Sequence, residues 1–384
     1  MNGMFMNGII NVYKEKGYTS HDVVAKLRRI CHQKKIGHTG TLDPDAEGVL
    51  VVCLGTATKV CGLLTDKDKV YEAVLLLGKE TDTQDTGGTV LREVQMQNTA
   101  EEVQAAVQSF HGAYSQIPPM YSALKVNGKK LCDLARAGVE VERSPRQVFI
   151  YEIEILWMQL PRVKLRVHCS KGTYIRTLCH DIGQKLGCGG CMEELRRTKV
   201  SIFELEHALT LAQIQELAEE NRLQEIVQPV DSLFTDHPAV QVKPQFQKML
   251  QNGNRLPEHA LFYDGTDRTA PVFETGQTYR VYLGQQFYGL YMADTGHGDY
   301  KPVKIFGQCQ LPETEQKQPD SKRRQKQLQP ETGPKQPDSQ RKQKQSRPET
   351  EQIQPDQEKQ SAYTAPGDRN GWEKRGNGGT VHEV

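Results

Sequence analysis

The stretch GHTGTLDPDAEGVL at residues 37–50 gathers glycines, two aspartates, a glutamate and a histidine, and it runs directly into the apolar segment VVCLG. A polar loop followed by a continuous apolar run predicts a loop that leads into a buried strand. Pro44 biases Asp43 toward an extended backbone, while Gly37 and Gly48 permit tight turns on either side. The carboxylate of Asp43 can therefore project as a reactive group, or it can cap a turn, as aspartates in such loops usually do.

The acidic residues of this stretch also suggest a metal site, but the pattern is weak. Asp43, Asp45 and Glu47 alternate along the chain. A calcium loop of the EF-hand type needs further oxygen ligands and a glutamate at its last position. We therefore expect no metal here, and a metal-dependent nuclease, which chelator would inactivate, remains the least favoured function.

The nine cysteines do not suggest a disulfide framework, because the chain is long, the count is odd and no secretory signal precedes the fold. Cys188 and Cys191 form a single C-x-x-C pair, whereas a structural zinc site needs a second pair at suitable spacing. No apolar run approaches membrane-spanning length. We expect a cytoplasmic protein without a membrane span and without a cofactor.

Composition divides the 384-residue chain into a body and a tail. From residue 310 onward the chain contains similar repeats that begin at Pro312, Pro330 and Pro348, and it has almost no aliphatic or aromatic residues. Such a segment cannot offset the entropy of ordering, so residues 310–384 are predicted to be a disordered tail. The tail holds 14 of the 49 basic residues and 12 of the 48 acidic residues. The body therefore has 35 basic and 36 acidic residues. Any cationic surface must therefore be local.

Residue periodicity predicts an α+β fold. Ser20 precedes Val23, Val24, Leu27 and Ile30, which share one helical face, and Thr99 with Glu102 forms a capping box before a second helix. The segment VKLRVHC at 163–169 alternates apolar and polar residues, and so do Ile153, Ile155 and Trp157. This alternation is typical of antiparallel sheets with one covered face.

A separate β-rich domain is predicted at 236–309, where GQTYRVYLGQQFYGLYMADTG is rich in aromatic residues and punctuated by glycines. This region resembles the C-terminal RNA-binding domain of the pseudouridine synthase and archaeosine transglycosylase (PUA) type.

Four segments resemble the bacterial tRNA pseudouridine-55 synthase (TruB) family: GHTGTLDPDAEGVLVVCLGTATK, DKVYEAVLLLGKETDTQD, IPPMYSALKVNGKKL and CSKGTYIRTLCHDIGQKLGCGG. They occur in the family's order over residues 5–232. The resemblance implies a pseudouridine synthase fold with a mixed, largely antiparallel central sheet at 1–235, an RNA-binding insertion at about 115–147, and an enzyme that isomerises uridine-55 in the T loop of tRNA.

The resemblance also implies roles for individual residues. Asp43 occupies the place of the essential aspartate, and Arg176 that of the arginine that orients it. Tyr174 occupies the place of a second active-site tyrosine, which is expected to contact the base or to assist removal of the carbon-5 proton. A carboxylate can act as a covalent nucleophile. Attack at ribose C1′, attack at uracil C6 and elimination to a glycal all remain open.

Three further residues match the family's base-binding positions. Tyr71 corresponds to the tyrosine that stacks on the extruded base, His38 to the histidine that fills the gap left in the loop, and Leu195 to an apolar residue that closes the uracil pocket. Without the resemblance, these residues would be read as a strand aromatic, a loop histidine and ordinary core.

The basic part of the insertion resembles the family's flap over the tRNA arm. Its proposed RNA-binding residues are Lys125, Lys129, Lys130 and Arg136. Cys132 stands where many relatives carry tyrosine, which puts one stacking or packing contact in doubt. We expect a monomer that binds the T arm of tRNA with no obligate protein partner. The alternative is a tRNA-binding protein that remodels RNA without modifying it.

Overall fold

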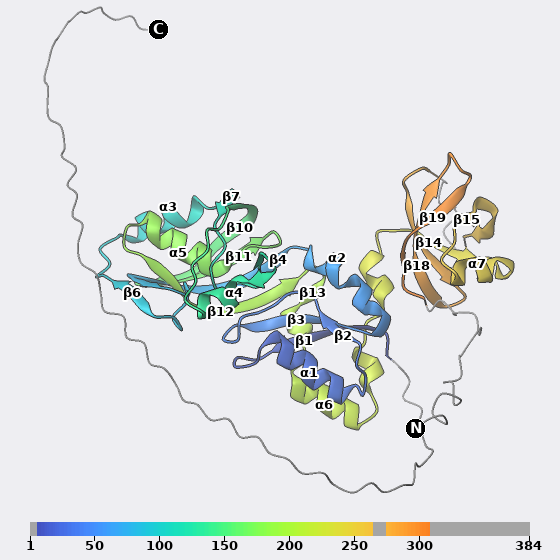
Figure 1. The fold of residues 1–384 in the computed structure, drawn as a ribbon, viewed down its shortest axis with the longest axis horizontal. Coiled ribbons are helices and arrows are strands. Elements are labelled where there is room, and N and C mark those ends of the chain that lie inside the picture. Colours follow the sequence, from blue (N-terminus) through green and yellow to red (C-terminus); the bar gives the residue numbers. More distant parts are fainter. Residues whose placement is uncertain (1–5, 264–273, 308–384) are drawn as a thin grey trace, which may run out of the picture. The chain divides into compact units, whose positions relative to one another are not determined.

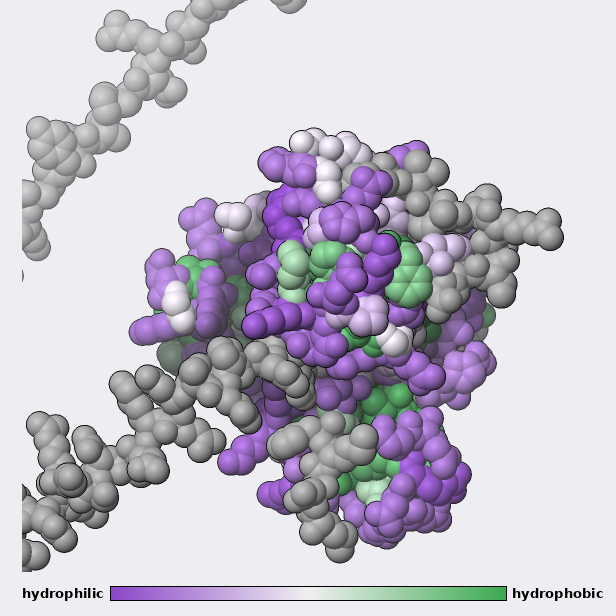
Figure 2. Space-filling view, turned by 90° about the vertical axis from the view of Figure 1, so that its right-hand side faces the viewer, coloured by the Kyte–Doolittle hydropathy of each residue, from purple (hydrophilic) through white to green (hydrophobic). Residues whose placement is uncertain are grey.

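The computed structural model describes residues 6–263 and 274–307 (Figure 1). The repeats after residue 310 lie outside the described residues, so their predicted disorder stays a prediction. No helix within the described ranges is both long and apolar enough to cross a membrane. On the face shown in Figure 2, hydrophilic residues predominate and apolar areas are small and scattered.

A nine-stranded sheet forms the larger part of the fold, with β1, β3, β12, β4, β11, β10 and β7 in spatial order. Two further strands, β2 and β13, pair with β3 and β12. The strands are β1 (Gly8–Lys14), β2 (Ile36–His38), β3 (Glu47–Leu54), β4 (Lys69–Leu77), β7 (Gly112–Gln116), β10 (Arg146–Gln159), β11 (Arg162–Cys169), β12 (Gly190–Val200) and β13 (Phe203–Glu204). Only the β12–β3 pair of this sheet is parallel, so the predicted mixed, largely antiparallel sheet is confirmed.

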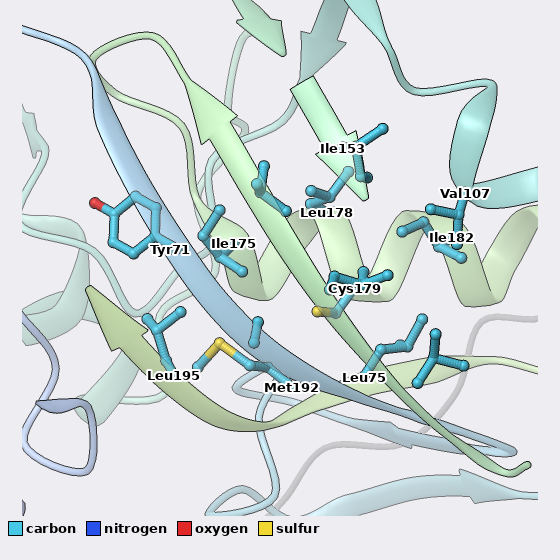
Figure 3. Close-up of a cluster of buried hydrophobic side chains, with 14 of the residues drawn as sticks. Tyr71, Leu75, Val107, Ile153, Ile175, Leu178, Cys179, Ile182, Met192 and Leu195 are labelled. Atoms are coloured by element: carbon cyan, nitrogen blue, oxygen red, sulfur yellow. The ribbon is translucent and has the colours of Figure 1, made fainter. Parts of the chain in front are cut away.

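Helices cover the sheet at two places. The helices α3 (Ala100–Gln108) and α5 (Ile175–Lys185) pack against β4, β10, β11 and β12, and α1 (Ser20–Ile30) and α6 (Leu211–Glu219) pack against β1 and β3 (Figure 1). Two short helices, α2 (Cys61–Thr65) and α4 (Leu131–Arg136), lie in connections. Figure 3 shows the first of these cores, where α5 places Leu178 and Ile182 against the sheet.

Two small hairpins project from connections: β5 (Lys79–Thr81) with β6 (Val90–Glu93), and β8 (Lys125–Val126) with β9 (Lys129–Lys130). A second, six-stranded sheet follows in the chain. Its strands are β14 (Ala239–Val242), β15 (Leu256–Pro257), β16 (Leu261–Phe262), β17 (Thr278–Leu283), β18 (Gln286–Asp294) and β19 (Asp299–Ile305), with helix α7 (Gln247–Gln251) between β14 and β15. The predicted β-rich region is confirmed, whereas its boundary at 236 and its PUA-like identity remain predictions.

Local sequence signals located helices α1 and α3. The capping box of Thr99 and Glu102 is present at the start of α3. Helix α1 is capped by Thr19 in a box with Asp22, and Ser20 is its first residue. The hydroxyl of Ser20 accepts the backbone N–H of Leu42 at 2.9 Å, which ties the helix to the loop that carries Asp43.

The predicted alternation of buried and exposed residues along the strands was wrong at one residue. Along β11 the apolar residues are buried and the polar ones are not, as alternation predicts. In β10 the register shifts between Ile155 and Trp157, because a bulge inserts an extra residue there. Trp157 is therefore 38% exposed and does not continue the buried row of Ile153.

Candidate active site

Asp43 lies in the loop between β2 and β3, held from both sides. The backbone N–H of Ala46 donates to the Asp43 carbonyl at 3.1 Å, which closes a turn around Pro44. Leu42, the residue before Asp43, is 4% exposed and packs in the core beside α5, so it anchors the loop on that side. The Asp43 side chain itself stays 38% exposed and can meet a substrate.

Arg176, on the first turn of α5, pairs with Asp43 through two contacts. Its Nε lies 3.1 Å from Oδ2 and its Nη2 donates to Oδ1 at 3.2 Å. This is the fork-to-fork geometry that a guanidinium and a carboxylate favour. Burial raises the pKa of Asp43, and Asp85 adds to the rise, while Arg176 and Lys14 oppose it.

The remaining donors of Arg176 are also used. Nη2 donates to the carbonyl of Tyr121 at 2.8 Å, and Nη1 donates to the carbonyl of Thr83 at 3.2 Å and to Asp85 at 3.4 Å. The Arg176 side chain is 8% exposed, so these contacts fix it in one orientation. Sequence reasoning missed Asp85; an aspartate in the polar run TDTQDTGG carries no local sign of this contact.

Lys14 is a buried cation beneath the loop, and sequence reasoning missed it as well. It is 0% exposed, and its ammonium donates to the carbonyls of Ala46, Pro44 and Glu15 at 2.5, 3.0 and 3.2 Å. Burial lowers the pKa of Lys14 to about 8. Because two of these carbonyls flank Asp43 closely, Lys14 holds the loop in shape and places a positive charge near the carboxylate.

Arg197 of β12 is a second buried cation, and it is 2% exposed. Its Nε donates to the carbonyl of Val49 at 2.7 Å and its Nη2 to that of Gly40 at 3.1 Å, which fixes the loop at both ends. At Gly48, φ is +105° and a Cβ would lie 2.2 Å from the Arg197 carbonyl oxygen, so only glycine fits.

Tyr71 and Leu195 form an apolar wall with Ile175. They lie on the neighbouring strands β4 and β12, and Figure 3 shows their side chains close to Ile175 of α5. Tyr71 is 9% and Leu195 7% exposed. Burial raises the pKa of Tyr71, and the positive charge of Arg197 opposes the rise. The sequence-predicted base-binding residues Tyr71 and Leu195 thus share one core.

Tyr174 is the residue directly before α5. Its backbone N–H donates to Oε1 of Gln116 at 2.8 Å, and its carbonyl accepts from Nε2 of the same glutamine at 3.0 Å. Gln116 is 1% exposed, so this pair of hydrogen bonds fixes the main chain at Tyr174. Burial raises the pKa of Tyr174, while the charges of Arg146 and Arg176 oppose the rise.

His38 ends β2, at the start of the loop. Its Nδ1 accepts the backbone N–H of Gly40 at 3.4 Å, and burial lowers the pKa of the imidazole. The role of His38 as a wedge, rather than as an acid–base catalyst, remains a prediction.

The four basic residues of the insertion lie on the surface, away from these buried contacts. Lys125, Lys129 and Lys130 are exposed on the β8–β9 hairpin, and Arg136 on α4 is 72% exposed and 3.7 Å from Asp133. Cys132, also on α4, is half-buried with its Sγ 3.7 Å from Asp133.

The acidic residues and the cysteine pair that were considered as metal ligands do not form a metal site. Glu47 accepts from Nε and Nη2 of Arg196 at 2.6 and 2.5 Å. Cys188 and Cys191 are buried free thiols. Within residues 6–263 and 274–307, no three His, Cys, Asp or Glu side chains are grouped so that they could hold a metal ion.

Comparison with known proteins places this geometry in a family. The model of the N-terminal domain of TruB family pseudouridylate synthases matches residues 28–175, and that of the tRNA pseudouridylate synthase B C-terminal domain matches 176–235. A tRNA pseudouridine synthase B of Lachnoclostridium phytofermentans is 53% identical over 310 residues, which are 78% of this chain and 100% of that protein. The chain belongs to the TruB family of pseudouridylate synthases.

Other TruB relatives and solved structures agree. A tRNA pseudouridine synthase B of Alkaliphilus oremlandii is 46% identical over 300 residues, covering 78% of this chain and 97% of that protein. Among solved structures, a chain of a Cbf5-Nop10-Gar1 complex is 27% identical with a TM-score of 0.58, covering 79% of this chain and 85% of its own. A chain of an H/ACA RNP bound to a substrate RNA is 25% identical with a TM-score of 0.57, covering 79% and 86%.

Proposed function

We propose that this TruB protein is a tRNA pseudouridine synthase that converts uridine-55 of the T loop to pseudouridine. The single observation that carries the proposal is the Asp43–Arg176 pair, a partly exposed carboxylate fixed by a buried guanidinium. The names of the relatives support tRNA as the substrate. The position within the T loop is the family expectation stated above.

In this mechanism Asp43 supplies the reactive carboxylate. The reaction breaks the bond between N1 of uracil and C1′ of ribose, rotates the base and forms a bond from C5 to C1′, so the product keeps the mass of the substrate. Asp43 acts at C1′, at C6 or through elimination to a glycal, and all three routes use an ionised carboxylate. Arg176 keeps Asp43 ionised and aimed.

Two tyrosines assist at the base. After the new bond forms, the proton on C5 must leave, and Tyr174, two residues before Arg176 at the start of α5, assists its removal. Tyr71 stacks on the extruded uracil and Leu195 closes the pocket, which offsets part of the stacking lost when the base leaves the loop. His38 fills the gap that the base leaves behind.

Binding of the T arm is assigned to the flap that carries Lys125, Lys129, Lys130 and Arg136. Their exposure on a hairpin and a short helix supports contact with phosphates rather than a structural role. The protein acts in this proposal as a monomer without a cofactor. The β-rich region at 236–309 is proposed to add RNA contacts.

The proposal is tested by incubating unmodified tRNA transcript with the wild type and mapping pseudouridine by carbodiimide labelling and reverse transcription. A stop at the T-loop uridine is expected. Tight binding without any stop would favour the alternative, a tRNA-remodelling protein that leaves the RNA unmodified. Shortened RNA that disappears on adding chelator would favour the nuclease.

A further inference from the structure

A run of basic residues begins at the end of β1 and continues through α1 to the start of β2. Residues 14–35 contain seven lysines and arginines but only two acids, whereas the body as a whole is close to neutral. Two of the seven serve the fold, because Lys14 is buried and Arg28 donates to the carbonyls of Lys34 and Ile36 at 3.1 and 3.4 Å. The other five are exposed and are called the α1 cationic surface below: Lys16, Lys26, Arg29, Lys34 and Lys35.

Helix α1 lies on the side of the sheet that carries the Asp43 loop. Side chains alternate along a strand, so Ile10, Val12 and Lys14 of β1 point to one face. Helix α1 packs on Ile10 and Val12. From the same face, Lys14 donates to two carbonyls of the Asp43 loop. The partly exposed carboxylate of Asp43 and the outer surface of α1 are therefore open to the same side.

The near end of the α1 cationic surface lies next to the active-site loop. The backbone N–H of Gly17 donates to the carbonyl of Pro44 at 3.0 Å, which places Lys16 beside this loop. The ammonium of Lys26 donates to the hydroxyl of Tyr18 at 2.7 Å and lies 4.3 Å from the centre of its ring. This contact joins the charge on the helix to the segment that carries Lys16.

The helix carries the surface away from the site over a short distance. Ser20, the first residue of α1, accepts the backbone N–H of Leu42, the residue before Asp43. Because a helix rises 1.5 Å per residue, Lys26 and Arg29 lie about 9 and 14 Å further along the axis. An RNA whose target uridine lies at Asp43 therefore has neighbouring parts of its backbone within reach of these charges.

Nearby acids do not neutralise the α1 cationic surface. Asp22 accepts the backbone N–H and the hydroxyl of Thr19 at 2.9 and 2.6 Å, so it is used in the helix cap. Glu15 is exposed, and so are Glu216 and Glu219 of α6, the helix that shares a core with α1. Among the described residues, none of the five basic side chains of the surface forms an ion pair with a carboxylate.

Helix stability explains only part of this charge. A cation in the last turn of a helix interacts favourably with the helix dipole, and Arg29 occupies such a position. Lys26 precedes the last turn, and Lys16 and Lys34 lie outside the helix. Unpaired cations gathered beside a substrate site favour a polyanion, and the phosphates of a nucleic acid backbone are the anions that lysine and arginine bind in this way.

We propose that the α1 cationic surface binds backbone phosphates of the substrate tRNA next to the part that enters the active site. This inference rests on the proposed function, because it takes the tRNA bound at Asp43 as its ligand. It assigns a phosphate contact to residues that lie outside both the catalytic pair and the basic flap.

The test uses a full-length triple variant, Lys26→Gln with Arg29→Gln and Lys34→Gln. The Kd for unmodified tRNA transcript is measured from about 50 to 200 mM salt. Each lost phosphate contact lowers the slope of log Kd against log salt by about 0.7 to 0.9, so the slope should fall by about 2 to 3. The single-turnover rate at saturating enzyme should stay unchanged, because the pair of Asp43 and Arg176 is intact.

The matched control removes the same charge from the other face of the sheet. It is a triple variant of β11, Arg162→Gln with Lys164→Gln and Arg166→Gln. The apolar residues that alternate with these three point into the core beneath α5, so the three basic side chains point away from the active-site face. The control should leave the slope unchanged.

Hydroxyl-radical footprinting of the tRNA then locates the contact. The wild type should protect a stretch of backbone that the α1 triple variant leaves exposed. A flap variant, Lys129→Glu with Lys130→Glu, should still protect this stretch, because the flap is a separate surface.

An unchanged slope and footprint in the α1 triple variant, with thermal stability intact, would overturn the inference and leave the surface to an acidic protein partner. An equal fall in slope for the β11 control would also overturn it, because the effect would then come from net charge alone. The inference fails separately from the proposed function: if the wild type binds tRNA but forms no pseudouridine, the slopes and footprints still decide on the surface.

Discussion

Replacing Arg176 by lysine removes the fork that holds Asp43 while keeping a positive charge. The guanidinium makes two contacts to Asp43 and one each to Asp85, Thr83 and Tyr121. A lysine ammonium has three donors and cannot bind a carboxylate in this parallel geometry. Losing two charged hydrogen bonds worth about 1.5 to 3 kcal/mol each and regaining one leaves a deficit of up to about 3 kcal/mol.

If this free energy is lost from the stabilisation of the transition state, the rate of the reaction drops up to about 100-fold. The assay is release of tritium from tRNA labelled at C5 of uridine, under single-turnover conditions with saturating enzyme, so that RNA affinity does not enter. Arg222→Lys is the control, because Arg222 forms a two-contact pair with Glu225 on the exposed surface. A folded Arg176→Lys protein with a rate within about threefold of the wild type would refute the role given to the ion pair.

Three further predictions concern buried and surface groups. Lys14 has a pKa of about 8 when folded and a higher one when unfolded, so above pH 8 the unfolded state binds more protons and stability rises with pH. Urea unfolding should therefore show wild type gaining stability relative to Lys14→Met from pH 8 to 10, and parallel curves would contradict the burial of this cation. Tyr71→Phe should keep the fold and much of the activity, because the buried ring is retained. Tyr71→Ala should lose about 3 to 5 kcal/mol of stability in thermal or urea unfolding and most tritium release. Reversing the charges of Lys129 and Lys130 should weaken tRNA binding and lower the slope of log Kd against log salt by about 2, and an unchanged slope would remove the flap from the RNA interface.

The sequence predicted those structural features that depend on residues close together in the chain. The capping box at Thr99 and the alternation along β11 depend on residues only a few positions apart, and both are present. The error at Trp157 arose because a bulge changes the period of a strand, and the partner strand determines where a bulge falls.

The site was accessible from the sequence only through the resemblance. Asp43 and Arg176 lie 133 positions apart, and nothing in composition brings them together. Lys14 and Arg197 were missed because a basic residue at the end of a strand ordinarily points to solvent. Their burial follows from the Asp43 loop folding over them and presenting carbonyl groups, a tertiary effect.

The most direct test of the central claim compares wild-type and Asp43→Asn protein on unmodified tRNA, without added metal, by carbodiimide labelling and reverse transcription. Asparagine preserves the size of the side chain and its capacity to accept a hydrogen bond from Arg176, but removes the charge. The account predicts a stop at the T-loop uridine with the wild type alone, while both proteins bind tRNA. A stop of equal strength with Asp43→Asn would contradict the assignment of Asp43 as the reactive carboxylate.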